Sequence, residues 1–208
     1  MNRGTAARYA AGILGGLMLA GVGTAAFAAY PDADDSADVD VNVEIAPVED
    51  GALSLTVDNT ETTLTEAGST ATYRQFTGAL PNVTVTDNRD AAPAGVYWYV
   101  TGQAGNFTGD ASQADITPDH LGWSPKVVTA NDGEVAEGDV VDTVLDTGAN
   151  NVGLAGEELL YLAIDSAEAH AANGQWTANA DLVLKTAVDV APGAYTSLLT
   201  LSLFEDAF

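Results

Sequence analysis

The chain has 208 residues, and its 30 acidic and 6 basic side chains give a formal net charge of −24 at pH 7. That charge repels nucleic-acid phosphates and anionic lipid head groups, so we expect neither as a partner. The chain contains no cysteine, which excludes disulfides, thiolate nucleophiles and cysteine-based metal sites. Its hydrophobic content of 47% suffices for the core of one domain of ordinary size.

Residues 1–28 are typical of a secretory signal peptide. Arg3 and Arg8 precede an apolar stretch, and Ala26-Phe27-Ala28 fits the small-x-small rule of signal peptidase. We predict that the segment is cleaved, with an uncleaved membrane anchor as the alternative. No second hydrophobic span follows, so the sequence predicts a secreted protein with no membrane span after cleavage.

Residues 29–50 form an acidic linker that ends in a predicted first strand. Aspartates spaced by small residues come first, and Val39, Val41, Val43 and Ile45 then alternate with polar residues. Alternating aspartates can ligate calcium, but the glycine and the final glutamate of an EF-hand loop are missing. We therefore expect a solvated linker with no bound metal.

Residues 51–208 form the main domain, and several of their segments show the period-two alternation of β-strands. In "VYWYVTG", Trp98 and Val100 lie on one face of the predicted strand, and Tyr97 and Tyr99 lie on the other. Further strands are predicted earlier in the chain, at Leu53–Val57, Tyr73–Phe76 and Val83–Val85.

The second half of the domain continues this series after a Gly- and Asp-rich region. It contains "GWSPKVV" and "DTVLD", and then residues 155–174, which are the only helix candidate and which equally fit a strand followed by a loop. "QWTANADLVLKTAV" has the longest alternation, and a turn at "VAPGA" leads into a closing strand. We predict that these two strands form a hairpin across Pro192-Gly193, with the final strand inside the sheet.

Many short strands with turns between them predict an all-β fold. The expected architecture is a β-sandwich of Greek-key or Ig-like type with at most one short helix.

Two segments of this domain resemble the WxL domain of Gram-positive cell-surface proteins. That family carries "TVTDTRG…GW-x-L" in mid-domain and ends in a hairpin of the type "PAG-x-YTATLTW-x-L". Here "VTVTDNRD" at Val83–Asp90 and "AGVYWYVTGQAGNFTGD" from Ala94 resemble the first part. "VAPGAYTSLLTLSLFEDAF" resembles the second part, so the resemblance covers Gly51–Phe208.

The motif positions themselves differ from the family pattern. Trp98 is followed by Val100 in place of Leu, and Leu201 with Leu203 stand where the second Trp-x-Leu falls. The resemblance implies non-covalent attachment to peptidoglycan and association with companion surface proteins. The Ala- and Asp-rich composition suggests an actinobacterial relative.

Aromatic residues are the candidates for contact with a ligand, because an aromatic face can stack on a sugar ring. Trp98 and Trp176 lie in register with aliphatic residues, which favours a place in the core. Trp123 lies in the loop-like stretch "HLGWSPK" and is the residue to test first for binding. Tyr99, next to Trp98, completes the candidate set.

No motif in the sequence indicates catalysis. His120 and His170, the only histidines, belong to no recognisable catalytic or zinc-binding motif, and no G-x-S-x-G elbow is present. Among 30 acidic residues, a carboxylate pair at glycosidase spacing arises by chance. We therefore expect a protein that is not an enzyme and needs no cofactor.

The leading hypothesis from the sequence is a secreted domain of the cell envelope that binds peptidoglycan or another cell-surface protein. One alternative is a structural subunit that associates with copies of itself through an edge strand. Another is an extracellular hydrolase acting on carbohydrate.

Overall fold

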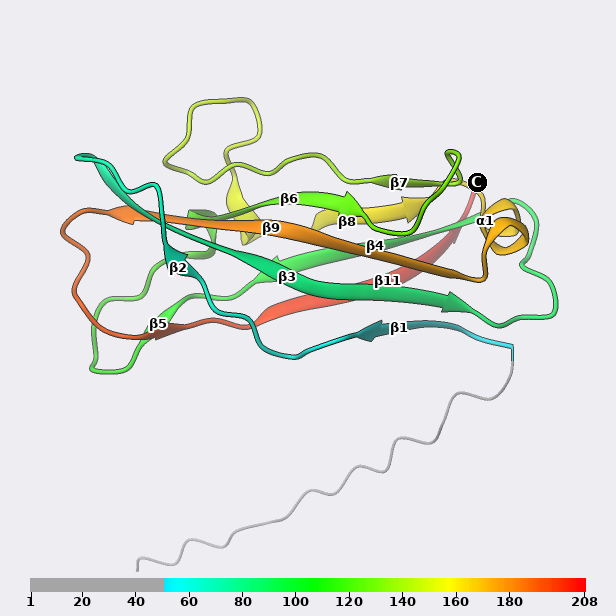
Figure 1. Cartoon of the computed structure of the whole chain (residues 1–208), viewed down its shortest axis with the longest axis horizontal. Coiled ribbons are helices and arrows are strands. Elements are labelled where there is room, and N and C mark those ends of the chain that lie inside the picture. The colour runs from blue at the N-terminus through cyan, green and yellow to red at the C-terminus, as the bar shows by residue number, and fades with distance from the viewer. Residues whose placement is uncertain (1–50) are drawn as a thin grey trace, which may run out of the picture. The chain divides into compact units, whose positions relative to one another are not determined.

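A computed structural model describes residues 51–208 as two antiparallel β-sheets packed against each other (Figure 1). The all-β sandwich expected from the sequence is confirmed, with one short α-helix among the described residues. The predicted signal peptide (1–28) and the acidic linker (29–50) lie outside these residues. The same holds for the strand predicted at the end of the linker and for the aspartates considered there as calcium ligands.

The first sheet, here called the β3 sheet, has the strand order β1-β3-β9-β6, and the short strand β2 also pairs with β3. Its central pair is long, because β3 and β9 match from Tyr73 opposite Ala187 to Thr86 opposite Gln175. The strands are β1 (Leu53–Val57), β2 (Thr65–Glu66), β3 (Tyr73–Asp87), β6 (Leu121–Val127) and β9 (Gln175–Ala187).

The second sheet, here called the β4 sheet, has the strand order β11-β4-β8-β7. The chain passes repeatedly from one sheet to the other, and a separate two-stranded ribbon joins β10 to β5. The remaining elements are β4 (Val96–Ala104), β5 (Thr108–Gly109), β7 (Val135–Glu137), β8 (Glu158–Ala163), β10 (Tyr195–Thr196), β11 (Leu199–Ala207), the helix α1 (Ser166–Ala172) and the 3-10 turns η1 (Pro118–His120) and η2 (Gly153–Ala155).

The core lies between the two sheets and follows the predicted alternation. Every second residue of β9 from Trp176 to Leu184 is buried, as the sequence predicted. On β4, Trp98 and Val100 point inward and are no more than 1% exposed. The buried residues of both sheets form one cluster, which is the hydrophobic core of the sandwich.

The predicted closing hairpin is wrong. β9 belongs to the β3 sheet, whereas β11 belongs to the β4 sheet and pairs with β4 over nine residues. The chain between them crosses from one sheet to the other and contributes β10 to the small ribbon with β5. β11 is therefore an edge strand, and it does not lie inside a sheet as the sequence suggested.

Two other segments differ in detail from the sequence-based expectation. Tyr73–Phe76 and Val83–Val85 belong to one continuous strand, β3, whose pairing with β9 shifts between Leu80 and Val83. Pro81 lies in this interruption, where a missing backbone N–H costs no ladder hydrogen bond. "DTVLD" is not a strand, since only Val141 just before it forms an isolated bridge, with Trp123.

The ambiguous segment 155–174 contains both a strand and a helix. Glu158–Ala163 forms β8, and the helix α1 follows after two residues. The Asp165 side chain caps this helix by accepting hydrogen bonds from the backbone N–H groups of Ala167 and Glu168. The helix is seven residues long, and it lies at one end of the sandwich (Figure 1).

A close contact between the sheets is made by Trp123 of β6 and Gly102 of β4. A Cβ atom placed on Gly102 would lie 2.7 Å from Cη2 and 2.9 Å from Cζ3 of the Trp123 ring. Trp123 is 1% exposed, so its ring has little free space to move into. Glycine at position 102 therefore lets the largest side chain of β6 reach across the core.

We predict that Gly102→Ala destabilises the protein by about 1–3 kcal/mol, because the added methyl group overpacks the core against Trp123. Denaturant unfolding followed by tryptophan fluorescence measures this change. Gly156→Ala is the matched control, since a Cβ at Gly156 meets no atom within 4 Å. Equal stability of the two variants would contradict the proposed contact.

Candidate binding surface

The three tryptophans lie in the core and present almost no surface to a ligand. Trp98 and Trp123 are 1% exposed and Trp176 is 2% exposed. The prediction that Trp98 and Trp176 occupy the core is confirmed. The expectation that Trp123 lies in a loop is wrong, because it belongs to β6 and faces Gly102 across the core. Ligand contact by a tryptophan would therefore require the sandwich to open.

The residues at the WxL-like positions also face the core. Val100 is fully buried, and Leu201 and Leu203 are half-buried and pack against the core cluster. Leu203 pairs with Val100, and Leu201 pairs with Gly102. These positions bring β4 and β11 side by side, with their apolar side chains on the inner face of the β4 sheet.

Tyr99 is the one candidate residue that lies on the outer face of this sheet, where it belongs to a row of four aromatic rings. We call Tyr97, Tyr99, Phe204 and Phe208 the aromatic ladder. Tyr97 and Tyr99 stack with ring centroids 5.8 Å apart, and Tyr99 and Phe204 stack at 5.2 Å across the β4–β11 pair. Phe208 lies 5.2 Å from Tyr97 with its ring tilted.

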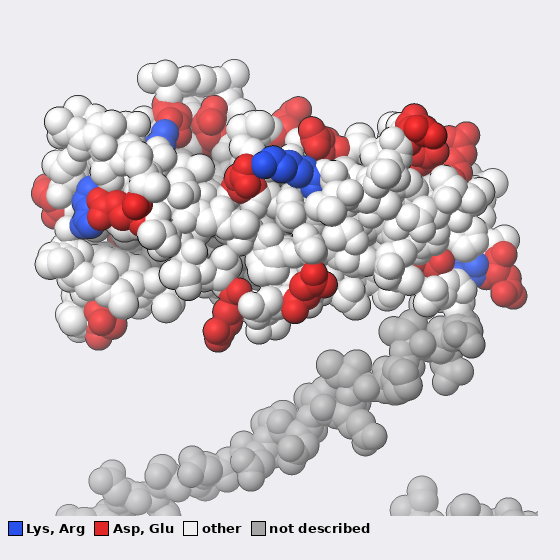
Figure 2. Space-filling model, viewed as in Figure 1, with Lys and Arg blue, Asp and Glu red and all other residues white. Residues whose placement is uncertain are grey.

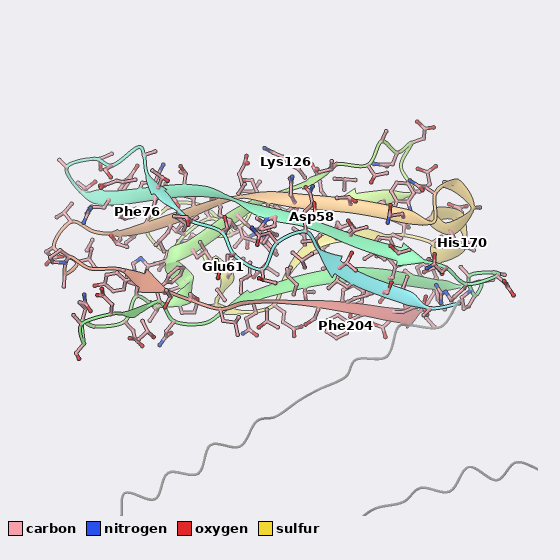
Figure 3. The ribbon with its side chains drawn as sticks, turned by 60° about the horizontal axis from the view of Figure 1, so that its bottom comes forward. Asp58, Glu61, Phe76, Lys126, His170 and Phe204 are labelled. Carbon is pink, nitrogen blue, oxygen red and sulfur yellow. The ribbon has the colours of Figure 1, made fainter. Side chains whose placement is uncertain are left out.

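The two ends of the aromatic ladder are its most accessible parts. Phe204 is 37% exposed and Phe208 is 78% exposed, whereas Tyr97 and Tyr99 between them are half-buried. In Figure 3, Phe204 lies at the outer margin of β11. Each end ring stacks or packs on one aromatic neighbour, and the exposed surface of the ladder lies mainly on these two rings.

A carboxylate belongs to the same surface. The Tyr99 hydroxyl donates a hydrogen bond of 3.0 Å to Asp206, and this bond raises the pKa of Tyr99 above its ordinary value. Asp206 lies opposite Tyr97 in the strand register. The outer face of β4 and β11 thus combines aromatic rings with hydrogen-bonding groups, which is the composition of a polar-ligand platform.

A second cluster lies where β3, β11 and α1 meet, and it centres on Arg89. The Arg89 guanidinium contacts Asp87 at 2.6 Å and Glu205 at 2.9 Å, and its side chain is 15% exposed. Asp87 ends β3, whereas Glu205 belongs to β11 in the other sheet. We call Asp87, Arg89 and Glu205 the Arg89 clasp, because it ties the last strand to the opposite sheet.

The clasp changes the ionisation of its members. Burial of Asp87 acts to raise its pKa, but hydrogen bonds and charge from Arg89 outweigh this effect, so the pKa lies below its ordinary value. The hydrogen bond to Asp87 in turn raises the pKa of Arg89. Asp87 and Arg89 both belong to "VTVTDNRD", the segment that resembles the WxL family. In this fold their ion pair links β3 to β11 through Glu205.

Ser166 and His170 of α1 lie near the Arg89 clasp, and together with Asp87 of the clasp they include the residue types of a hydrolase triad. Ser166 is fully buried, and its hydroxyl is 3.5 Å from Glu205. His170 Nδ1 is 3.9 Å from Asp87, which is beyond hydrogen-bond distance. His120 belongs to the 3-10 turn η1, away from this group in the sequence, and contacts the Lys185 carbonyl oxygen. The Ser166 group therefore supports the Arg89 clasp, and we assign it no catalytic role.

A shallow hollow of about 460 Å³ lies along β8 and the segment that follows β7. Asp139, Asn150 and Glu158 contribute its polar lining, and burial raises the pKa of Glu158. Within residues 51–208, no group of three or more side chains is placed to hold a metal ion.

Every basic side chain of residues 51–208 is paired with an acid. Arg74 contacts Glu66, Lys126 contacts Asp181, Lys185 contacts Asp146, and Arg89 is held in the clasp. Figure 2 shows the consequence on one face, where each blue group touches a red one and further red groups stand alone. The part of the chain that the structure describes therefore offers no free cation to an anionic ligand.

Comparison with protein-family models and with curated proteins found no match. In the described domain, α1 is too short and too polar to cross a bilayer, and no other helix there could do so.

Sequence inspection identified Tyr99 but missed the other three members of the aromatic ladder. Tyr97 lies on the same predicted face as Tyr99, but recognising Phe204 and Phe208 required knowing that β11 lies beside β4, whereas the predicted hairpin placed it beside β9. A signal was nonetheless present, because Phe204, Asp206 and Phe208 alternate with the inward-facing leucines of the same strand.

We predict that Arg89→Ala destabilises the protein by about 2–4 kcal/mol at pH 7, because it leaves Asp87 and Glu205 without their counter-ion in a partly buried site. Since the folded-state pKa of Asp87 is lowered, the clasp stabilises the fold above the pKa of an unfolded aspartate and is lost as the pH falls through the lower folded value. The difference between wild type and variant should therefore shrink below about pH 4.

Denaturant unfolding across this pH range provides the measurement. Arg74→Ala is the control, because its ion pair with Glu66 is exposed and should contribute less than about 1 kcal/mol. A difference for Arg89→Ala that stays constant down to pH 2 would refute the assignment.

Proposed function

We propose that this chain is a secreted, non-catalytic β-domain of the cell envelope that binds the glycan strands of peptidoglycan through the aromatic ladder. The amino-terminal segment supports export, since residues 1–28 have the features of a signal peptide. The resemblance to WxL domains supports a wall-associated role. The aromatic ladder is the observation that carries the proposal.

The ladder suits a sugar ligand for two physical reasons. The apolar faces of hexopyranose rings stack on aromatic rings, and the ladder exposes part of its end rings, Phe204 and Phe208. Sugar hydroxyls also need hydrogen-bond partners, and Asp206 and the tyrosine hydroxyls lie on the same surface.

Charge favours the glycan strand over other polymers of the wall. The chain carries a formal net charge of −24, and each cation of residues 51–208 is already paired. Polyanionic wall polymers would be repelled, whereas an uncharged sugar ring binds without an opposing field. We therefore expect binding that changes little with salt concentration.

We predict that Tyr97→Ala and Phe204→Ala each weaken binding to purified peptidoglycan about fivefold to tenfold, because each removes a ring from the ladder. Sedimentation of residues 29–208 with wall fragments at increasing concentration measures the affinity. Trp123→Ala is not a suitable test, because that side chain fills the core.

Tyr73→Ala serves as the control, since Tyr73 is also a half-buried aromatic residue but belongs to β3 in the other sheet. All three variants must first show the unfolding transition of a folded domain. Unchanged wall binding by both ladder variants, or equal weakening by the control, would refute the proposed surface.

A further inference from the structure

We propose that the free edge of β11 accepts an extended, positively charged segment of a partner protein by strand addition. This inference goes beyond the proposed function, because it uses the backbone of β11 and not the outer face of the ladder. It rests on three observations: an open edge, apolar side chains along it, and the distribution of charge.

β11 is the longest open edge in the described part of the chain. One side of the strand pairs with β4 from Leu199 opposite Ala104 to Ala207 opposite Val96, without any shift in register. The other side pairs with no strand of residues 51–208. A straight row of backbone N–H and C=O groups thus remains available for a further strand.

The other edges of the two sheets are shorter or carry protective features. β7 has three residues and β1 has five. β6 contains Pro125 and Lys126, two residues that discourage strand pairing, and Val141 already forms a bridge with its Trp123. β11 has no proline, no lysine and no bulge along its whole length. The two charged residues of β11, Glu205 and Asp206, lie near its end, so Leu199–Phe204 is the longest uncharged and unbroken stretch among these edges.

The side chains along this edge favour an apolar, alternating partner segment. Leu199, Leu201 and Leu203 pack against the core but remain only half-buried, and no strand of residues 51–208 pairs beside them on the open edge. Leu198, just before the strand, is 75% exposed. An added strand whose alternate residues are apolar would cover these leucines and gain roughly 25 cal/mol for each Å² of apolar surface removed from water.

Charge complementarity selects the occupant. A second copy of this chain would bring the same net charge of −24 to the edge and be repelled. Since the cations of residues 51–208 are all paired, the domain presents mainly unpaired carboxylates to an approaching molecule. The partner segment is therefore expected to carry lysine or arginine at the positions that point to solvent.

The proposal is tested with three fluorescent nonapeptides and the exported chain, residues 29–208. The first alternates valine with lysine, the second alternates valine with glutamate, and the third is the lysine peptide with alternate backbone nitrogens methylated. We expect the lysine peptide to bind at least tenfold more tightly than either of the others in anisotropy titrations. Its binding should also slow amide hydrogen exchange within Leu199–Ala207.

A matched pair of variants locates the site. Ser202→Lys places a positive charge on β11 and should weaken binding of the lysine peptide at least fivefold, whereas Thr56→Lys makes the same charge change on β1 and should leave it unchanged. Equal binding of the methylated peptide would overturn the proposal, because it would show attraction by charge alone.

Two other occupants of the edge are also distinguishable. A dimer in sedimentation velocity that Ser202→Lys dissociates would overturn the proposal in favour of a second copy. Exchange protection of the β11 edge in the free protein that disappears on deletion of residues 29–46 would overturn it in favour of the chain's own linker. Loss of wall binding in Tyr97→Ala with unchanged peptide binding would separate this site from the glycan surface.

Discussion

The structure depends on filling the space between two sheets with large side chains, because a chain without cysteine has no disulfide to hold the sheets together. Tyr161 of β8 shows how this is done. Its ring meets Trp98 edge to face at 5.3 Å, and its buried hydroxyl lies 3.1 Å from the Val83 carbonyl and 3.2 Å from that of Trp176. A side chain of one sheet thus reaches the backbone of the two central strands of the other. Burial raises the pKa of Tyr161, so its hydroxyl remains a hydrogen-bond donor.

The inward placement of the tryptophans explains why the outer face carries the candidate surface. On a strand, neighbouring residues point to opposite faces, so placing Trp98 and Val100 in the core places Tyr97 and Tyr99 outside. The same rule on β11 puts Leu201 and Leu203 inside and Phe204 outside. The pairing of β4 with β11 then brings the outer rings of both strands together. The register between β4 and β11 therefore determines both the packing of their inner side chains in the core and the stacking of their outer rings in the ladder.

Local alternation could be predicted from the sequence, but the partners of each strand could not. The inner faces of β4 and β9 follow directly from the spacing of their apolar residues. The Pro192-Gly193 turn resembled a hairpin turn, yet Gly193 lies in the connection that leads from β9 through β10 to β11 in the other sheet. Whether a turn returns a strand to the same sheet depends on contacts distant in sequence. Trp123 was misplaced for a similar reason, because Gly102, the residue that accommodates it, lies in the other sheet.

The position of β11 places both proposed binding surfaces on one strand. Its outer side chains belong to the aromatic ladder, and its free backbone edge faces away from β4. The Arg89 clasp joins the end of this strand to the opposite sheet, because one guanidinium contacts both Glu205 of β11 and Asp87 of β3. The ladder uses ring faces and the edge uses backbone hydrogen bonds, but both meet at Phe204, whose ring lies on β11 beside the open edge. If both proposals hold, a glycan strand on the ladder and a protein segment on the edge would both contact β11, and the last strand would connect the two ligands.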